Sequence, residues 1–338
     1  MKIDIYPHFL PLKYKEALLK KANQNFYSAK WDQVFDGTPG LYDVDNRLRM
    51  LDRHEGLAQV LTLSSPAVEK IADPETAVYL SKLANDGLAE LVTTYPDRFV
   101  AAAACLPMNN MDAALDETDR AIKDLKLKGV QVYTPVNGKP LDLPEFLPLY
   151  EKMASYDLPI WIHPTKDATI PDYVNESFSK YSIFQLFGWP FETAASMTRL
   201  VFSGVLEKYP GVKFLTHHCG GMVPFFDHRI FTAKEFTEVN LKGNLGSYLK
   251  RHPIDYYRMF YTDTANAGTT PGLMCGYAFF GAEHMLFGTD APYDGGDGDP
   301  STRSIMKSIE LMDIGRQEKE MIFAGNAKKL LRLGNELT

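Results

Sequence analysis

The sequence predicts a (β/α)8 barrel, an α/β fold in which parallel strands alternate with helices. Short apolar segments alternate eight times with stretches of helical periodicity along the 338 residues. This alternation is typical of parallel β/α architecture, in which strands are buried on both faces. No glycine-rich dinucleotide fingerprint follows the first strand, which disfavours an open doubly wound sheet. No linker divides the chain, and we therefore expect a single domain over residues 1–338.

The first half of the chain supplies five of the strands. Alternate side chains of a strand share a face, so Asp4, Tyr6 and His8 are expected to point the same way in the first one. Residues of about 11–43, rich in aromatic residues and glycine, predict an inserted cap or long loop. The other strands are expected at 59–64, 99–104, 129–133 and 158–163, and the helices between them at about 43–56, 74–95, 111–127 and 146–153.

The second half begins with another long excursion, from 164 to about 190, so that insertions follow the first and fifth strands. A helix with Leu200, Val201 and Val205 on its apolar side comes next. Strands are expected at 212–217, 259–263 and 285–290, with a helical and loop-like segment at 225–251. Helices at about 302–311 and 316–333 end the chain.

Composition excludes several classes of protein. The net charge of −7 comes without a basic patch, so neither nucleic acid nor an anionic membrane surface is an expected partner. We find no signal-peptide pattern and no run of about 18 apolar residues, and we expect a cytoplasmic protein. Cys105, Cys219 and Cys275 are too few and too scattered for a disulfide framework and are expected to be free thiols.

Polar side chains stand at the carboxyl ends of five expected strands. In barrels these ends meet at one rim, where active sites form. Imidazole and carboxylate together suit Zn, Mn or Fe with an open position for water or substrate, although a hydrogen-bonded polar plug is the alternative. The remaining histidines, His54, His228, His252 and His284, are expected to be structural or at the surface. The rim residues are Tyr6, His8, His163, His217, His218, Asp263 and Asp290.

Nine stretches, spread nearly end to end, carry a family resemblance. They are 3–11, 47–66 with Leu51-Asp52 and Val60-Leu61, Tyr95-Pro96-Asp97-Arg98-Phe99, Gly129-Val130-Gln131-Val132, Leu158-Pro159-Ile160-Trp161-Ile162-His163-Pro164, Trp189-Pro190-Phe191-Glu192-Thr193, Phe202-Ser203-Gly204-Val205 leading to Tyr209-Pro210, His218-Cys219-Gly220-Gly221 with Pro224, and Gly288-Thr289-Asp290-Ala291-Pro292. With these motifs the chain resembles amidohydrolase-related proteins of the aminocarboxymuconate-semialdehyde decarboxylase type, which include resorcylate, dihydroxybenzoate and carboxyvanillate decarboxylases.

The resemblance implies one divalent ion, Zn or Mn, held by His8, His163 and Asp290. Where the family has His or Glu as a further ligand on the first strand, this chain has Tyr6. A neutral phenol is a poor ligand, since tyrosine ionises near pH 10. Three alternatives follow: the three ligands with water, the same set with Tyr6 as a fourth or outer-shell group, or no metal.

The resemblance also implies which residue of the sixth strand is the acid/base. The spacing to Gly220-Gly221 and Pro224 matches His218 to the catalytic histidine of the family. His217 is then expected to face the other way and to pack or bond elsewhere. With Asp290, His218 would move the proton in a metal-dependent, non-oxidative decarboxylation of an aromatic or muconate-like acid.

Substrate contacts are expected from Arg47, through a second carboxylate, and from Trp189, Phe191 and Tyr293 as an aromatic wall. A helix-surface position for Arg47 and core packing for the aromatic residues are the alternatives. Two other functions stay open. The same site could activate water as a hydrolase or hydratase, or the barrel could bind a ligand without metal. The resemblance further implies a homodimer or higher homo-oligomer, with residues 225–251 in the contact and Arg229 reaching a neighbouring site.

Overall fold

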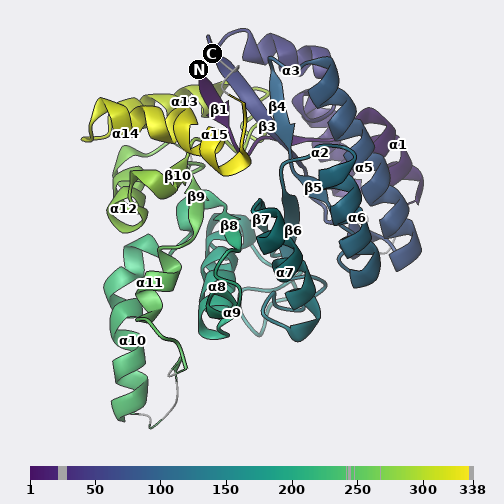
Figure 1. Cartoon of the computed structure of the whole chain (residues 1–338). Helices are drawn as coiled ribbons and strands as arrows, with labels where there is room; N and C mark the ends of the chain where they lie inside the picture. The colour runs from purple at the N-terminus through teal and green to yellow at the C-terminus, as the bar shows by residue number, and fades with distance from the viewer. Residues whose placement is uncertain (22–28, 241, 243–244, 247, 267, 335–338) are drawn as a thin grey trace.

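The computed structural model describes residues 1–21, 29–240, 242, 245–246, 248–266 and 268–334, and it has the predicted barrel (Figure 1). Every strand pair in it is parallel. The first and third strand positions are each divided in two. In chain order the strands are β1 (Lys2–Asp4), β2 (His8–Phe9), β3 (Leu57–Leu63), β4 (Phe99–Ala102), β5 (Ala104–Cys105), β6 (Val130–Thr134), β7 (Pro159–Pro164), β8 (Lys213–Thr216), β9 (Tyr261–Asp263) and β10 (Met285–Leu286).

Backbone hydrogen bonds close the sheet into a ring. The strands from β5 to β10 pair in sequence order, and β3 pairs with β1, β2 and β4. Between the first and last strands, the Ile5 N–H donates to the Phe287 carbonyl at 2.8 Å, and the Asp290 N–H donates to the Tyr6 carbonyl at 3.1 Å. The expected (β/α)8 barrel is thereby confirmed, and the loops that follow its strands share one rim.

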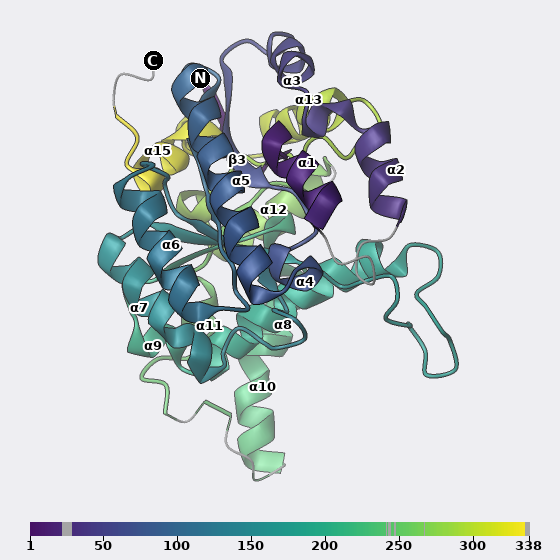
Figure 2. The same ribbon diagram turned by 90° about the vertical axis from the view of Figure 1, so that its right-hand side faces the viewer.

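Helices cover the outside of the ring, and α5, α6 and α7 lie side by side in Figure 2. The longest, α5, begins with Pro74 at its first position, and the Asp73 carboxylate caps it by accepting from the Thr76 N–H at 3.0 Å. From residue 44 onward the α-helices are α3 (Val44–Leu51), α4 (Val68–Ile71), α5 (Pro74–Thr94), α6 (Met111–Lys123), α7 (Leu147–Tyr156), α8 (Trp189–Phe202), α9 (Val205–Lys208), α10 (Asp227–Asn240), α11 (Pro253–Tyr257), α12 (Thr270–Phe280), α13 (Asp299–Glu310), α14 (Arg316–Glu320) and α15 (Asn326–Leu331). None of the described helices is long and apolar enough to cross a membrane.

An apolar plug fills the barrel interior beneath the rim. Trp161 is its largest side chain; it is fully buried, and its indole N–H donates to the Ile5 carbonyl at 3.0 Å. Gly129 makes room for it, because a Cβ there would lie 2.4 Å from the Pro159 carbonyl oxygen and 2.6 Å from the Trp161 ring, at a φ of +145°. The plug contains Ile3, Ile5, Tyr6, Val60, Ala101, Ala103, Trp161, Leu215 and Leu286, and the same cluster includes Ala324, Ala327, Leu330 and Leu331 from the C-terminal helical segment.

The first strand departs from the expected alternation. It bends at Ile5 and pairs again only at His8, so Ile3, Ile5 and Tyr6 all belong to the interior cluster. Asp4 lies on the other side, where it accepts from the Thr289 N–H at 3.0 Å and the Gln59 amide at 3.1 Å. The prediction that Asp4 shares a face with Tyr6 and His8 is therefore wrong, because the interruption shifts the parity of the strand.

The two long excursions differ in how they pack. In the first, residues that we expected to form a cap or loop form α1 (Leu12–Lys21), α2 (Ala29–Gly37) and the 3-10 turn η1 (Pro39–Leu41). Tyr14 and Leu18 of α1 are buried in one cluster with Leu80 of α5. The second excursion, residues 165–188, runs out from the barrel as the teal loop at the right of Figure 2 and returns into α8.

Candidate active site

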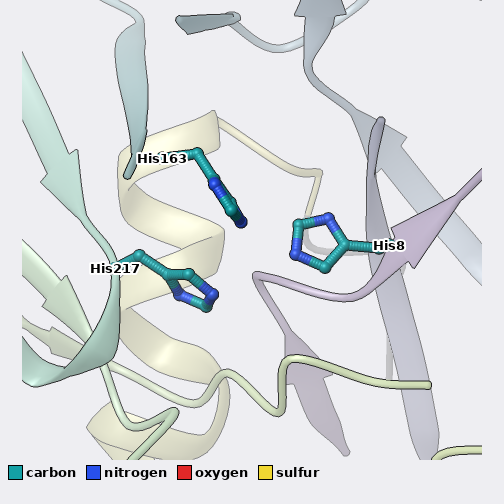
Figure 3. A group of neighbouring side chains, drawn as sticks. All are labelled: His8, His163 and His217. Atoms are coloured by element: carbon teal, nitrogen blue, oxygen red, sulfur yellow. The ribbon is translucent and has the colours of Figure 1, made fainter. Parts of the chain in front are cut away.

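Four side chains from distant parts of the chain converge at the rim. His8 lies in β2 and His163 in β7, while His217 follows β8 and Asp290 follows β10. One ring nitrogen each of His8, His163 and His217 lies within 4.8 Å of the others. Figure 3 shows these three imidazoles pointing toward one another. Asp290 Oδ1 lies 3.2 Å from His8 Nε2 and 3.3 Å from His217 Nε2. The carboxylate therefore completes a ring of nitrogen and oxygen donors.

In each of these three histidines, Nδ1 contacts an oxygen atom on the side of the imidazole that faces away from the centre. His8 Nδ1 lies 3.3 Å from the Leu63 carbonyl oxygen, and His163 Nδ1 lies 2.7 Å from that of Pro164. His217 Nδ1 bonds the Asp263 carboxylate. Since carbonyl and carboxylate oxygens accept, each Nδ1 carries a proton, and in the neutral imidazole Nε2 then directs its lone pair to the centre.

These residues fit a divalent metal ion. The Nε2 atoms of His8 and His217 are buried and have no hydrogen-bond partner in the described part of the chain, because their close contacts with Asp290 lack hydrogen-bond geometry. Buried polar atoms without partners are costly, and a shared cation would satisfy them together. Imidazole and carboxylate are ligands that zinc and manganese sites use. The oxygens that bond each Nδ1 from behind correspond to the outer-shell groups that orient histidine ligands in such sites.

The charges of the protein groups act strongly on one another here. Burial and the neighbouring His8 and His217 lower the pKa of His163 well below 6.5. Burial also disfavours the His217 cation, but Asp263 and Asp290 outweigh that effect and raise its pKa to about 10. At neutral pH His217 Nε2 therefore carries a proton that a metal ion would displace on binding. Burial favours neutral Asp290, yet His217 and the contacts with His218 and His8 hold its pKa well below 3.8. Asp290 is therefore ionised at neutral pH.

The prediction that His217 faces away from the site is wrong. His217 is fully buried beside Asp290. It follows Leu215 by two residues and therefore lies on the same face of the strand, and Leu215 belongs to the interior plug. After it, His218, Cys219 and Gly220 all have positive φ, so the chain turns sharply and brings both histidine rings to the same side, with centroids 3.8 Å apart. Sequence reasoning could have found His217 only by knowing which face Leu215 occupies.

His218 lies on the side of the cluster that faces the mouth. Its side chain is 15% exposed, its Nε2 is 3.7 Å from Asp290 Oδ2, and its ring stacks on Trp189 at 6.2 Å between centroids. Gly221 permits this turn, because a Cβ at that position would lie 2.3 Å from the Pro190 carbonyl oxygen, and its φ is +62°. Burial and the neighbouring His217 lower the pKa of His218 below 6.5.

Tyr6 lies beneath the cluster as a stacked ring. Its centroid is 3.9 Å from that of His217, with an angle of 17° between the ring planes. The hydroxyl is buried without a hydrogen-bond partner among the described residues. Burial, together with Asp263 and Asp290, raises the pKa of Tyr6 well above 10, so the phenol stays neutral.

The expected contact between Arg47 and a substrate carboxylate is contradicted by the burial of Arg47. Its Nη2 donates to the carbonyl oxygens of His8 and Gly40, both at 2.7 Å, and its Nη1 donates to the Gln59 side chain at 3.0 Å. The guanidinium is neither at the mouth nor on the helix surface. It holds the backbone of β2 in place.

Two of the three expected aromatic residues lie at the histidine cluster. The Trp189 ring is 6.0 Å from that of His163, and the Tyr293 ring is 5.7 Å from that of His8. Phe191 is 61% exposed, and none of the ring contacts among the described residues joins it to a histidine. A cleft of about 340 Å³ opens beside Tyr293 and is bordered by Pro39, Gln185 and Asp297. Its size suits a small organic ligand.

The other histidines lie away from this cluster, as expected. His54 bonds Asp299 at 2.9 Å, and His284 Nδ1 contacts the Phe260 carbonyl at 3.0 Å. His228 and His252 both stack on Phe231. Cys105, Cys219 and Cys275 are free thiols.

A (β/α)8 barrel with three imidazoles and a carboxylate at its carboxyl rim is the architecture of a metal-dependent enzyme. A family model described as amidohydrolase matches residues 3–333, and the chain belongs to this family. It is 31% identical over 304 residues to gamma-resorcylate decarboxylase of Polaromonas sp., covering 86% of this chain and 87% of that protein. It is 27% identical over 346 residues to 2-amino-3-carboxymuconate-6-semialdehyde decarboxylase of Dictyostelium discoideum, covering 98% and 92%.

Solved structures agree with these relatives. A 2,6-dihydroxybenzoate decarboxylase in complex with 2,6-dihydroxybenzoate superposes with a TM-score of 0.81 at 26% identity, over 98% of each chain. A dihydroxybenzoic acid decarboxylase from Polaromonas sp., with bound manganese and the inhibitor 2-nitroresorcinol, has a TM-score of 0.80 at 27% identity, over 99% of this chain and 98% of that one. The chain is therefore an enzyme of the carboxy-lyase type with a site for a single metal ion. Hydrolysis and metal-free binding, which the residues alone left open, are not favoured.

Proposed function

We propose that this enzyme removes CO₂ without oxidation from an aromatic or muconate-like carboxylic acid. One observation carries the proposal: His218 and Asp290 lie side by side where the histidine cluster meets the mouth, beneath Trp189 and beside Tyr293. A planar acid placed there would have its carboxylate toward the cluster and its ring between the two aromatic side chains.

His8, His163 and Asp290 would hold a Zn or Mn ion. When bound, the ion supplies Lewis-acid polarisation of the substrate carboxylate and of a neighbouring hydroxyl or carbonyl oxygen. The chain itself positions the substrate through the Trp189 and Tyr293 rings. Tyr293 is fixed in turn, because its hydroxyl bonds that of Ser64.

His218 and Asp290 are placed to move the proton. A proton delivered to the carbon that bears the carboxylate allows the bond between that carbon and the carboxylate to break. The electron pair of this bond then restores the conjugated system as CO₂ leaves. His218 Nε2 and Asp290 Oδ2 are 3.7 Å apart, so either group lies within reach of one substrate atom. The reaction consumes one proton, which the pair takes from solvent at the partly exposed His218 edge.

The test measures CO₂ release by metal-loaded protein from a panel of hydroxybenzoates and muconate-like acids. We expect at least one substrate, deuterium from D₂O at the vacated carbon, and a fall in kcat of about 10²–10⁴-fold in His218→Asn. No CO₂ from the whole panel, or an unchanged rate in the variant, would reject the proposal. Solvent ¹⁸O in the product would instead indicate hydrolysis or hydration.

We further propose a homodimer or higher homo-oligomer that uses α10. This helix projects from the barrel in Figure 1, and none of its described side chains is buried. Phe236 and Val239 are among its exposed apolar residues. Light scattering should give a multiple of 38.1 kDa for the wild type and the monomer mass for Phe236→Glu, while Leu311→Glu, at the exposed residue that caps the C-terminal end of α13, serves as control. Monomeric wild type at micromolar concentration would reject the assembly.

Three further proposals concern the same chain. Arg229 of α10 would reach the site of a neighbouring subunit, so Arg229→Ala should raise KM in the assembled protein. Residues 1–338 would form one domain, with about 11–43 as an insertion, and limited proteolysis should leave no stable fragment of half size. A cytoplasmic location agrees with three free thiols, which a reducing compartment maintains, and cell fractionation tests it.

A further inference from the structure

The imidazole of His217 is held as firmly as the imidazoles of His8 and His163, although no family motif includes it. All three rings present Nε2 to a common centre (Figure 3). Asp290 Oδ1 lies almost equally far from His217 Nε2, at 3.3 Å, and from His8 Nε2, at 3.2 Å. His217 Nε2 is buried without a hydrogen-bond partner among the described residues. His217 Nε2 is therefore placed relative to the Asp290 carboxylate in the same way as the Nε2 of His8.

We propose that His217 is a metal ligand in this chain, so that three imidazoles and one carboxylate hold the ion and His217 replaces the family's first-strand ligand at position 6. The inference rests on the proposed metal site, but it does not depend on the reaction or the substrate. It resolves the place where this chain differs from the family pattern, since Tyr6 stands where the family has His or Glu.

Asp263 is built as the positioning residue behind this ligand. Its Oδ1 accepts from the backbone N–H groups of Cys219 at 3.1 Å and Ala265 at 3.0 Å. These bonds fix the carboxylate, and its Oδ2 bonds His217 Nδ1. A carboxylate that accepts from the far nitrogen of an imidazole orients the ring and strengthens it as a donor to metal. Asp263 is fully buried, and its hydrogen bonds go to the histidine and to the backbone of Cys219 and Ala265.

Tyr6 contributes packing instead of coordination. Its ring stacks face to face on His217, with centroids 3.9 Å apart. A phenol that covers the face of the imidazole keeps that ring in the plane in which Nε2 points at the centre. Replacing Tyr6 by Phe keeps this stacked surface and removes only the hydroxyl.

His218 is a poor candidate for the same role, although it lies in a second possible donor group with His217 and Asp290. Its Nδ1 has no hydrogen-bond partner among the described residues, so no group behind the ring fixes its tautomer. Its Nε2 is 3.7 Å from Asp290, and its ring lies against Trp189 at the mouth. The adjacent histidines therefore divide two tasks: His217 binds the ion and His218 is left for the proton.

The experiment counts imidazoles on the metal and measures its affinity, both without substrate. X-ray absorption of the zinc-loaded protein should give three imidazoles for wild type and Tyr6→Phe, and two for His217→Gln. In competition with a chelator, His217→Gln should lose more than about 100-fold in zinc affinity, beyond the effect of losing an outer-shell partner, and Asp263→Asn about 10–100-fold. His218→Gln removes the adjacent imidazole as the matched control and should stay within about threefold, because an unbound neighbour adds no ligand bond.

Two imidazoles in wild type would overturn the assignment, and this result does not require that any variant folds. A His217→Gln protein of unchanged zinc affinity, or a Tyr6→Phe protein that loses zinc, would also overturn it. Absence of bound zinc or manganese from wild type would reject the proposed metal site itself. Failure to find a decarboxylated product would leave the ligand count as it is, so the two failures are distinguishable.

Discussion

Arg47 gives the sharpest test of how β2 is held in place. In Arg47→Met the carbonyl oxygens of Gly40 and His8 and the Gln59 side chain lose their donors. Three buried acceptors at about 2 kcal/mol each amount to about 6 kcal/mol. Burial lowers the pKa of Arg47 from 12.5 to about 10, against the raising effect of Asp4. The substitution therefore relieves a burial cost of about 3 kcal/mol, leaving a net loss of about 3 kcal/mol.

Urea unfolding of the metal-loaded protein measures this difference, and a KM determination accompanies it. We expect the loss in the free energy of unfolding together with weaker metal binding, because the released carbonyl belongs to the ligand residue His8. Arg49→Met, on the same helix but exposed, is the matched control and should change stability by less than about 0.5 kcal/mol. If Arg47→Met kept wild-type stability while KM rose tenfold, Arg47 would be a substrate ligand and the reasoning would be refuted.

Three other predictions concern pH, the mouth and the metal. Burial raises the pKa of Glu69 from 4.5 to about 7, so the folded chain binds more protons than the unfolded chain between these pH values, and stability should fall as pH rises through that window. Glu69→Gln should remove this slope and be more stable above pH 7 by up to about 3 kcal/mol; thermal scans from pH 5 to 8 with the same slope in both proteins would contradict it. Trp189→Leu should raise KM about tenfold, since it removes one aromatic wall worth about 1 kcal/mol or more, and leave metal content unchanged; loss of metal would instead indicate a structural role. Chelation should lower Tm, and added manganese or zinc at 100 times Kd should restore about 2.7 kcal/mol; a Tm indifferent to chelator would argue against a site formed by His8, His163 and Asp290.

The alternation of apolar strands and helices was sufficient to predict the barrel. Once the barrel is known, strand-end histidines must meet at one rim, because parallel strands bring all their carboxyl ends to the same edge. His163 and Asp290 follow from that rule, and the motifs around them indicate the family. Local sequence pattern suffices to predict the barrel and its rim, because each strand and helix is recognised from the periodicity of a short segment.

Where each remaining side chain points depends on contacts between distant segments, which local pattern does not contain. The bend at Ile5, between strand segments that pair with different stretches of β3, moved Asp4 out of the site. Arg47, which reads as an amphipathic helix residue, is buried against β2 by the packing of α3 on the barrel. His217 was expected to face away, but it shares the inward face of Leu215, has Asp263 of the next strand behind its ring, and lies with His8 and His163 at one centre. The sequence by itself determined the barrel, the rim and the family; only the tertiary structure decided which imidazoles share a centre, because closure of the barrel sets those distances.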